Sequence, residues 1–147
     1  MPDSKPVKIA DALATAITAA ASTFSITAFT CQRDWKPVLD LKDLATLQLR
    51  VIPGPTDLEP LARRYSRGEV AIVVTIQKQA TTKADADELD YFAEEISDFI
   101  GTNDSSAAQA PDNAFYRGHE ITDADTIGGR ELPQFSKVLR IRYQYFA

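Results

Sequence analysis

VAIVVTIQKQ, at residues 70–79, is the stretch that decides the fold. Every second residue from Val70 to Ile76 is apolar and β-branched, so one face of an extended strand is wholly apolar. The other face, from Ala71 to Gln77, is itself half apolar near its middle. Two such faces predict a central strand that is covered on both sides. We expect residues 63–67 to extend this strand backwards, with Gly68 at a bulge or turn.

Shorter segments on either side also alternate between apolar and polar residues, which is typical of strands. The segment at 47–52 is predicted to end at Pro53-Gly54-Pro55, because proline cannot donate to a ladder. The segment between it and the preceding strand, residues 32–42, is expected to be irregular. The remaining predicted strands cover residues 24–28, 115–121 and 138–145.

Two segments have apolar residues at helical spacing. The first runs from about Lys5 to Ala21, and its apolar side is mostly alanine, so close packing is expected. The second begins at Thr81 or Thr82 and carries acidic residues in its first turns, where they complement the helix dipole. Its apolar stripe runs from Leu89 to Ile100, and Gly101 is expected to end it in the left-handed conformation.

The order of these elements contains few strand–helix–strand alternations. It therefore favours an α+β fold over a doubly wound parallel sheet. We expect a mostly antiparallel sheet of four to five strands with two main helices packed on it, in a single domain over residues 1–147. The segments at 101–113 and 123–133 are rich in small and polar residues and are predicted to be mobile loops.

Composition and charge exclude several classes of protein. The 147 residues include one cysteine, so no intrachain disulfide forms, and no apolar run approaches the length of a membrane span. No signal-peptide pattern is present at the N-terminus, so we expect the protein to stay in a cytoplasm unless it leaves inside a larger particle. Residues 1–80 carry 10 basic and 8 acidic side chains, and residues 81–147 carry 6 and 13. The acidic part is unsuited to nucleic acid.

The sequence contains no pattern typical of an active site, a metal site or a cofactor site. His119 is the single histidine, and no G-x-S-x-G turn accompanies it, so it is interpreted as an exposed or locally bonded side chain. Cys31 is interpreted as a buried or incidental thiol. Asp123 and Asp125 begin a calcium-like loop, but Ile127 occupies a ligand position, so the match fails. We therefore expect no enzyme activity, no metal and no cofactor.

Two further features bear on contacts with partners. Trp35 is interpreted as a core anchor, with an interface anchor as the alternative. Arg63, Arg64 and Arg67 form a small basic cluster, for which the simpler interpretation is a solvated turn before a strand.

The order of elements resembles that of the tail terminator, or tail completion, proteins of long-tailed bacteriophages. The resemblance covers nearly the whole chain and rests on a diffuse pattern of residues. These are the alanine-rich helix, the strand ending at Phe29, the segment with Arg33, Trp35 and Pro37, residues 39–44, the strands at 47–52 and 69–79, the run 87–90, and the last strand, 138–145.

The resemblance implies a structural virion protein without catalytic residues. It implies a hexameric ring that sits on the last ring of the tail tube, stops tube growth and presents the surface that joins the head. The implied partners are further copies of the chain, the tail tube protein and the head–tail connector or neck proteins, with no membrane and no sequence-specific nucleic acid. The implied location is the head-proximal end of the tail, after assembly in the host cytoplasm.

The charge asymmetry suggests how such a ring would be held. We hypothesise that Arg63, Arg64 and Arg67 meet acidic residues of a neighbouring subunit or of the tail tube, in head-to-tail contacts that close into a ring. The alternatives are another neck or tail component, such as a head–tail connector or tail tube subunit, and a small ligand-binding domain or hydrolase.

Overall fold

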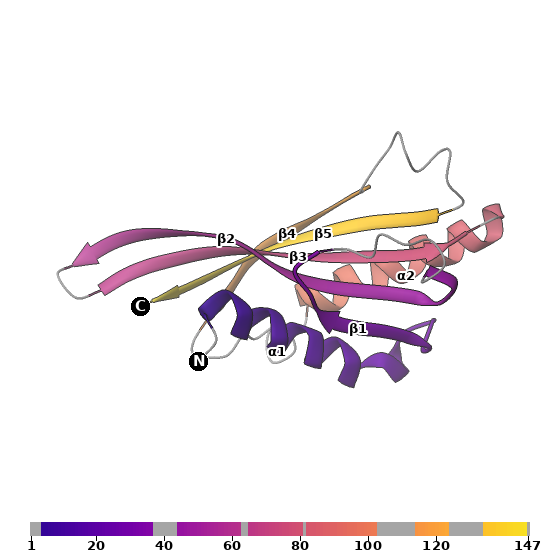
Figure 1. Cartoon of the computed structure of the whole chain (residues 1–147), viewed down its shortest axis with the longest axis horizontal. Helices are drawn as coiled ribbons and strands as arrows, with labels where there is room; N and C mark the ends of the chain where they lie inside the picture. Colours follow the sequence, from indigo (N-terminus) through magenta and orange to yellow (C-terminus); the bar gives the residue numbers. More distant parts are fainter. Residues whose placement is uncertain are drawn as a thin grey trace.

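The structure is a computed structural model that describes residues 4–36, 44–62, 65–80, 82–102, 114–123 and 134–146. It contains two long helices and five strands, arranged in two layers (Figure 1). In chain order the elements are α1 (Lys5–Ala19), the 3-10 turn η1 (Ala21–Thr23), β1 (Phe29–Arg33), β2 (Leu47–Ala62), β3 (Tyr65–Gln79), α2 (Lys83–Thr102), β4 (Phe115–Asp123) and β5 (Gln134–Phe146).

The five strands form one sheet in the order β1-β2-β3-β5-β4. β1 is parallel to β2, and the other three pairings are antiparallel. The expected α+β architecture, a mostly antiparallel sheet with two helices, is confirmed. β3 is the central strand, as its apolar faces predict, and it pairs with β2 on one side and β5 on the other.

One face of the sheet carries the apolar side chains that pack under both helices. α1 lies against β1, β2 and β3, and α2 lies against β5 and β4. The side chains of Val51, Val74 and Leu139 are direct neighbours across three strands, and all three are fully buried. Burying one such side chain stabilises the fold by about 1.5–3 kcal/mol relative to leaving it exposed. The repeated apolar pairs therefore supply much of the driving force for folding.

Aromatic rings join the two helical halves of this core. Phe24, just after η1, places its ring 5.9 Å from that of Phe92 and 5.5 Å from that of Phe99, both edge-on. The backbone N–H of Ser25 donates to the Glu95 carboxylate at 3.0 Å. The strand predicted at residues 24–28 is therefore wrong: Phe24 packs into the core and Ser25 binds α2, so this segment crosses between the helices.

The first edge strand begins later than expected. β1 covers Phe29–Arg33 and includes residues 32 and 33, which were expected in an irregular connection. The ring centroid of Phe29 lies 5.4 Å from that of Phe92, which places Phe29 beside the core.

The two ends of α2 agree in part with the sequence prediction. The Asp85 backbone N–H donates to Thr82 Oγ1 at 3.1 Å, which confirms the predicted cap. The expected end at Gly101 is wrong, because α2 continues to Thr102, and Gly118 is the described glycine with a positive φ, at 123°. A Cβ at Gly101 would lie 3.0 Å from the ring of His119, so glycine here makes room for a side chain of β4.

β2 continues beyond the prolines that were expected to end it. It runs to Ala62, with a register shift between Pro53 and Thr56. β1 pairs with β2 at Leu47–Val51, so the outer edge of β2 beyond Val51 carries no described strand there. Prolines at such an edge cost no ladder bond, which explains why they do not end the strand. Gly54 fits the irregularity because a Cβ would lie 2.4 Å from the Ala71 carbonyl oxygen.

The outer parts of β2 and β3 form a projection that we call the hairpin arm, residues 56–62 and 65–70. The arm extends to the left of α1, while α2 lies toward the opposite end of the molecule (Figure 1). Pairing of Arg67 with Phe146 brings the end of β5 alongside the arm. The predicted backward extension of the central strand is confirmed for residues 65–67, and residues 63 and 64 lie outside the described residues. The bulge or turn expected at Gly68 is wrong, because Gly68 pairs in unbroken register with Leu58 and Tyr145.

The second face of the sheet also has buried polar positions. Thr75 and Gln77 are each 5% exposed, but both described helices pack on the first face, so the expected cover on the second face of the central strand stays a prediction. Neither described helix is long and apolar enough to cross a membrane.

Gly68 tests the packing at the base of the arm. A Cβ at this position would lie 2.4–2.8 Å from ring atoms of Tyr145, and that ring is buried. We expect Gly68→Ala to lower the free energy of unfolding by about 1–3 kcal/mol, as overpacking typically does. In a Tyr145→Leu background the same substitution should cost less. Urea unfolding of the four proteins in this cycle measures the difference, and equal costs in both backgrounds would contradict the proposed clash.

Candidate functional site

Of the three arginines predicted to make subunit contacts, Arg67 lies in the hairpin arm. Arg63 and Arg64 lie outside the described residues, between Ala62 and Tyr65. Arg67 lies on β3, opposite Glu59 of β2 and Phe146 of β5, and it is half-buried. The contact assigned to these three arginines stays a prediction.

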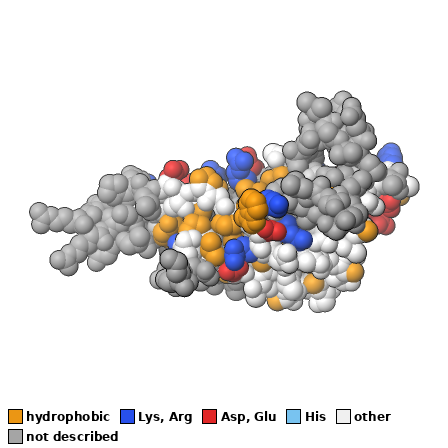
Figure 2. Space-filling view, in the orientation of Figure 1, with side chains coloured by type: hydrophobic (Ala, Val, Ile, Leu, Met, Phe, Trp, Pro, Cys, Tyr) orange, Lys and Arg blue, Asp and Glu red, His pale blue; other side chains and the backbone are white. Residues whose placement is uncertain are grey.

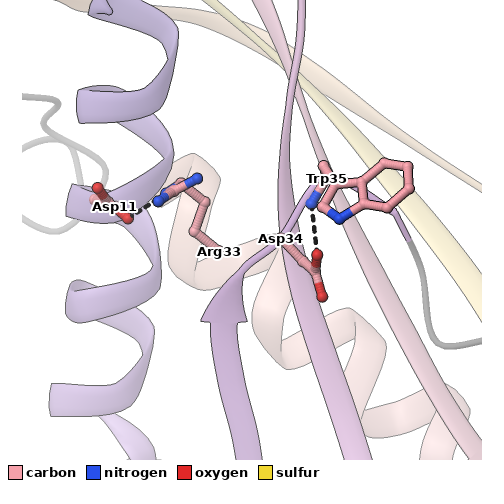
Figure 3. A network of polar contacts seen from close by, with 4 residues as sticks. All are labelled: Asp11, Arg33, Asp34 and Trp35. Carbon is pink, nitrogen blue, oxygen red and sulfur yellow. Dashed lines mark hydrogen bonds and ion pairs between the residues drawn. The ribbon is translucent and has the colours of Figure 1, made fainter. Parts of the chain in front are cut away.

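The end of β1 forms a second candidate contact, which we call the Trp35 corner (Asp34, Trp35, Lys36 and Arg50). Asp34 organises it with both its backbone and its side chain. The Asp34 N–H donates to the Val51 carbonyl at 3.0 Å, and Asp34 Oδ1 accepts the Trp35 backbone N–H at 2.7 Å (Figure 3). Arg50 Nε lies 3.6 Å from Asp34 Oδ2. The backbone at Trp35 is therefore held by contacts that do not involve its indole ring.

Trp35 itself projects from this corner. The interpretation as a core anchor is wrong, because its side chain is 75% exposed. The Lys36 ammonium lies 4.7 Å from the indole centroid, in a cation–π contact that covers part of the ring. An exposed tryptophan on an ordered turn is typical of a protein–protein contact, because tryptophan is enriched among the residues that dominate binding energy. The sequence analysis gives an interface anchor as the alternative interpretation of Trp35, and the exposed side chain is compatible with that alternative.

A groove lies beside this corner, between α1 and β1, and we call it the α1–β1 groove. It is open to solvent and encloses about 470 Å³. Arg33 Nε lies 2.7 Å from Asp11 Oδ1, an ion pair that joins the strand to the helix at the groove (Figure 3). The lining residues are Asp11, Ala14, Thr15, Thr18 and Ala19 of α1 and Cys31, Gln32 and Arg33 of β1.

Cys31 is an inert member of this groove. Burial raises the pKa of its thiol to about 12, and this effect outweighs the opposing influences of Arg50 and the Thr18 hydroxyl. The thiolate is the reactive form of cysteine, so this side chain is a poor nucleophile and a poor metal ligand. The expectation of an unreactive thiol agrees with its half-buried position against the core.

His119 links β4 to α2. Its Nε2 is hydrogen-bonded to the Ser97 hydroxyl at 2.7 Å, and its Nδ1 to the Tyr116 hydroxyl. Burial lowers the pKa of His119, and the nearby Asp98 opposes this shift. The predicted locally bonded histidine is confirmed. The hydrogen bond between Ser97 and His119 has the length expected for a nucleophile and its base. The imidazole ring, however, packs directly against Gly101 of α2. We therefore interpret the hydrogen bond as one that holds β4 on the helix.

A smaller concavity lies where β4 and β5 meet. It encloses about 250 Å³ and is lined by His119, Glu120, Arg140 and Arg142. Glu120 is the direct cross-strand neighbour of Arg140, so part of the positive charge is compensated within the sheet. Arg142 lies over Gly118, where a Cβ would be 3.2 Å from its guanidinium.

The outer surface of α2 is acidic. Lys137 Nζ lies 2.8 Å from Asp90 Oδ1, and Tyr91 is 58% exposed on the same helix. In the view of Figure 2, basic and acidic side chains are interspersed around apolar ones in the middle of the molecule. Exposed acidic residues of α2 are Asp85, Asp87, Glu88, Asp90, Glu94 and Asp98.

Over the part of the chain that the structure describes, no three histidine, cysteine or acidic side chains come together as a metal site. The calcium-like loop that begins at Asp123 lies largely outside the described residues.

Comparisons with known proteins give weak similarities. No model of a known protein family and no curated protein matches the sequence. A solved structure of the virion of a native gene transfer agent particle is similar at 15% identity, over 95% of this chain and 90% of that chain, with a TM-score of 0.46. The crystal structure of the type 4 fimbrial biogenesis protein PilO from Pseudomonas aeruginosa is similar at 12% identity, over 65% of this chain and 55% of that chain, with a TM-score of 0.26. Both TM-scores lie below 0.5, so neither similarity supports a conclusion about function.

His119 predicts a pH dependence of stability. Its pKa is lowered in the folded protein from the ordinary value of 6.5. The unfolded chain therefore binds more protons as the pH falls through about 6.5, and the stability that His119 contributes at higher pH is lost below it. We expect the free energy of unfolding to fall between pH 7.5 and pH 5.5, and to fall less in a His119→Gln variant. Identical slopes in the two proteins would exclude His119 as the cause.

The free energy of unfolding of a Trp35 variant distinguishes an exposed contact residue from a core residue. Since its ring is mostly exposed, Trp35→Ala should change the free energy of unfolding by no more than about 0.5 kcal/mol. Phe92→Ala, which empties a fully buried position, should cost about 3–5 kcal/mol. Urea unfolding followed by circular dichroism compares them. A cost for Trp35→Ala as large as that for Phe92→Ala would place the ring in the core.

Proposed function

We propose that the chain is a structural virion protein that caps the end of a phage tail tube, ends tail growth and forms the surface that joins the head. The resemblance in element order supports this role. The observation that carries it is the row of exposed carboxylates on α2, a helix that lies toward the opposite end of the molecule from the arm (Figure 1). In the proposal, Arg63, Arg64 and Arg67 meet these carboxylates as individual side chains, since Asp57 and Glu69 are also exposed on the arm.

Such an arrangement suits contacts between different surfaces of identical subunits. When one subunit's arm meets the next subunit's α2, the contact repeats, and it closes into a ring if the rotation between subunits allows. Opposite charges steer such an encounter and set its register more than they add affinity. We propose a ring on this basis, hexameric as the family resemblance implies, with the tail tube as the second acidic partner that the arm arginines can meet.

The Trp35 corner adds an anchor to this picture. Its backbone is held by Asp34 before any partner arrives, so little conformational freedom is lost on binding. A protein whose exposed tryptophan follows a backbone held in place in the free subunit fits an assembly component. The rest of the neck, including the head–tail connector, is the class of partner that this corner would meet.

Loss of the gene tests the proposed role directly. In a phage or phage-like element that encodes this chain, its deletion should give tails longer than normal, because nothing stops the growing tube. Electron microscopy of the particles measures tail length. Tails of normal length with detached heads would instead identify a head–tail connector, and particles without tubes would identify a tail tube subunit.

Charge reversal tests the arm. We expect Arg63→Glu combined with Arg64→Glu to reduce complementation of the deletion at least tenfold, and Arg67→Glu to add to the loss. Reversal of Arg140 and Arg142 changes net charge equally at exposed positions of β5 and is the matched control. Unfolding curves establish that each variant is folded. Full complementation by the arm double variant would reject the proposed contact.

A further inference from the structure

The concavity where β4 and β5 meet, which we call the β4–β5 concavity, has charged walls that the proposed function does not use. It encloses about 250 Å³, and its lining residues are His119, Glu120, Arg140 and Arg142. Arg140 and Arg142 are two residues apart on β5, so their side chains leave the same face of the sheet. The alternate residues of this strand, Leu139 and Ile141, are buried under the helices, so the two arginines stand on the opposite face.

The register of the sheet leaves Arg142 without a charged neighbour. The residues opposite it are Ala71 on β3 and Gly118 on β4. Gly118 has a φ of 123°, and a Cβ there would lie 3.2 Å from the Arg142 guanidinium, so the glycine leaves room for this side chain. Among the described residues, no hydrogen bond or ion pair engages the guanidinium. Arg142 therefore brings an uncompensated positive charge to the concavity.

Arg140 has one charged and one apolar neighbour. Glu120 lies opposite it on β4, and Val73 lies opposite it on β3. Arg140 and Glu120 are both exposed, and within the described part of the chain no ion pair joins them. The Arg140 guanidinium is therefore also available to a ligand, although the carboxylate beside it offsets part of its charge.

His119 adds no charge to the concavity near neutral pH. Burial lowers the pKa of its imidazole, and both ring nitrogens are already hydrogen-bonded, Nε2 to Ser97 and Nδ1 to Tyr116. The charged donors that remain for a ligand are the two guanidiniums. Together with the carboxylate of Glu120, they give the concavity one net positive charge.

We infer that the β4–β5 concavity binds one small carboxylate anion between the guanidiniums of Arg140 and Arg142. The planar fork of an arginine side chain matches the two oxygens of a carboxylate. Residues two apart on a strand have Cα atoms about 7 Å apart, so two long side chains can reach a single group between them. One net positive charge suits a monoanion, whereas Glu120 would repel the second charge of a phosphate group.

This inference goes beyond the proposed role in a phage tail and does not rest on it. The contact proposed there joins the arm to α2 and does not include the concavity. Anion binding by the purified chain and complementation by the arm variants are therefore separate measurements, and either can fail without the other.

Titration of the purified chain with sodium acetate tests the inference. Acetate replaces chloride at constant ionic strength and pH 7, and NMR follows the side-chain Nε–H signals of the arginines. We expect saturable shifts at Arg140 and Arg142, in the millimolar range because the groups are exposed, and no saturable shift at Arg117. Shifts that rise linearly without saturation, or that are equal at all arginines, would show screening by salt alone and overturn the inference.

Three exposed positions provide matched variants for the same titration. Arg142→Gln should weaken acetate binding about tenfold, the loss of one charge-assisted hydrogen bond. Arg117→Gln removes an exposed arginine of β4 that does not line the concavity, and it should leave binding unchanged.

Glu120→Gln should strengthen acetate binding about twofold to fivefold, because a repelling charge at the surface is removed. A gain of affinity is a result that damage to the fold would not give, and unchanged backbone spectra establish that each variant is folded. Acetate binding that is insensitive to both Arg142→Gln and Glu120→Gln would overturn the site. Tighter binding of inorganic phosphate than of acetate by the unaltered chain would overturn the choice of a carboxylate.

Discussion

The structure depends on the burial of alternate apolar side chains along β3. From Val70 to Ile76 these side chains are fully buried. Val70, Ile72 and Val74 each have an apolar neighbour on β5, and Ile76 has one on β2, Leu49. Both helices cover this same face, so a charge placed on it would be desolvated without a partner. Because the period of a strand is two, the same constraint fixes the register of the neighbouring strands and the direction of every side chain on the second face.

That constraint explains which parts of the fold could be predicted. The central strand and α2 have long, regular patterns, and Thr82 caps α2 as its sequence indicates. The strand placed at residues 24–28 failed because alternation in a short segment does not distinguish a strand from a crossing in which Phe24 packs on Phe92. Pro53 did not mark the end of β2. A proline removes a ladder hydrogen bond only where another strand lies on that side, and the sheet order is needed to know this.

The candidate contacts were predictable to different degrees. Arg63, Arg64 and Arg67 were identified from charge alone. The backward extension of the central strand was predicted, but the length of β2 that pairs with it to form the arm was not. Trp35 was assigned to the core on the average burial of tryptophan, but Asp34 turns the chain after β1 and leaves the ring outside. The α1–β1 groove has no sequence signature, because it arises only when α1 lies beside an edge strand. The acidic surface of α2 and the exposed Trp35 are the described features on which the proposed contacts depend.

The central claim is that this chain is a building block of a tailed particle and acts through its surfaces. Electron cryomicroscopy of particles from the phage or phage-like element that encodes it tests this most directly. The account predicts a ring of copies at the head-proximal end of the tail tube, with the arm of each copy against α2 of the next. Particles that lack the chain altogether, or that hold it as isolated copies without mutual contacts, would contradict the account.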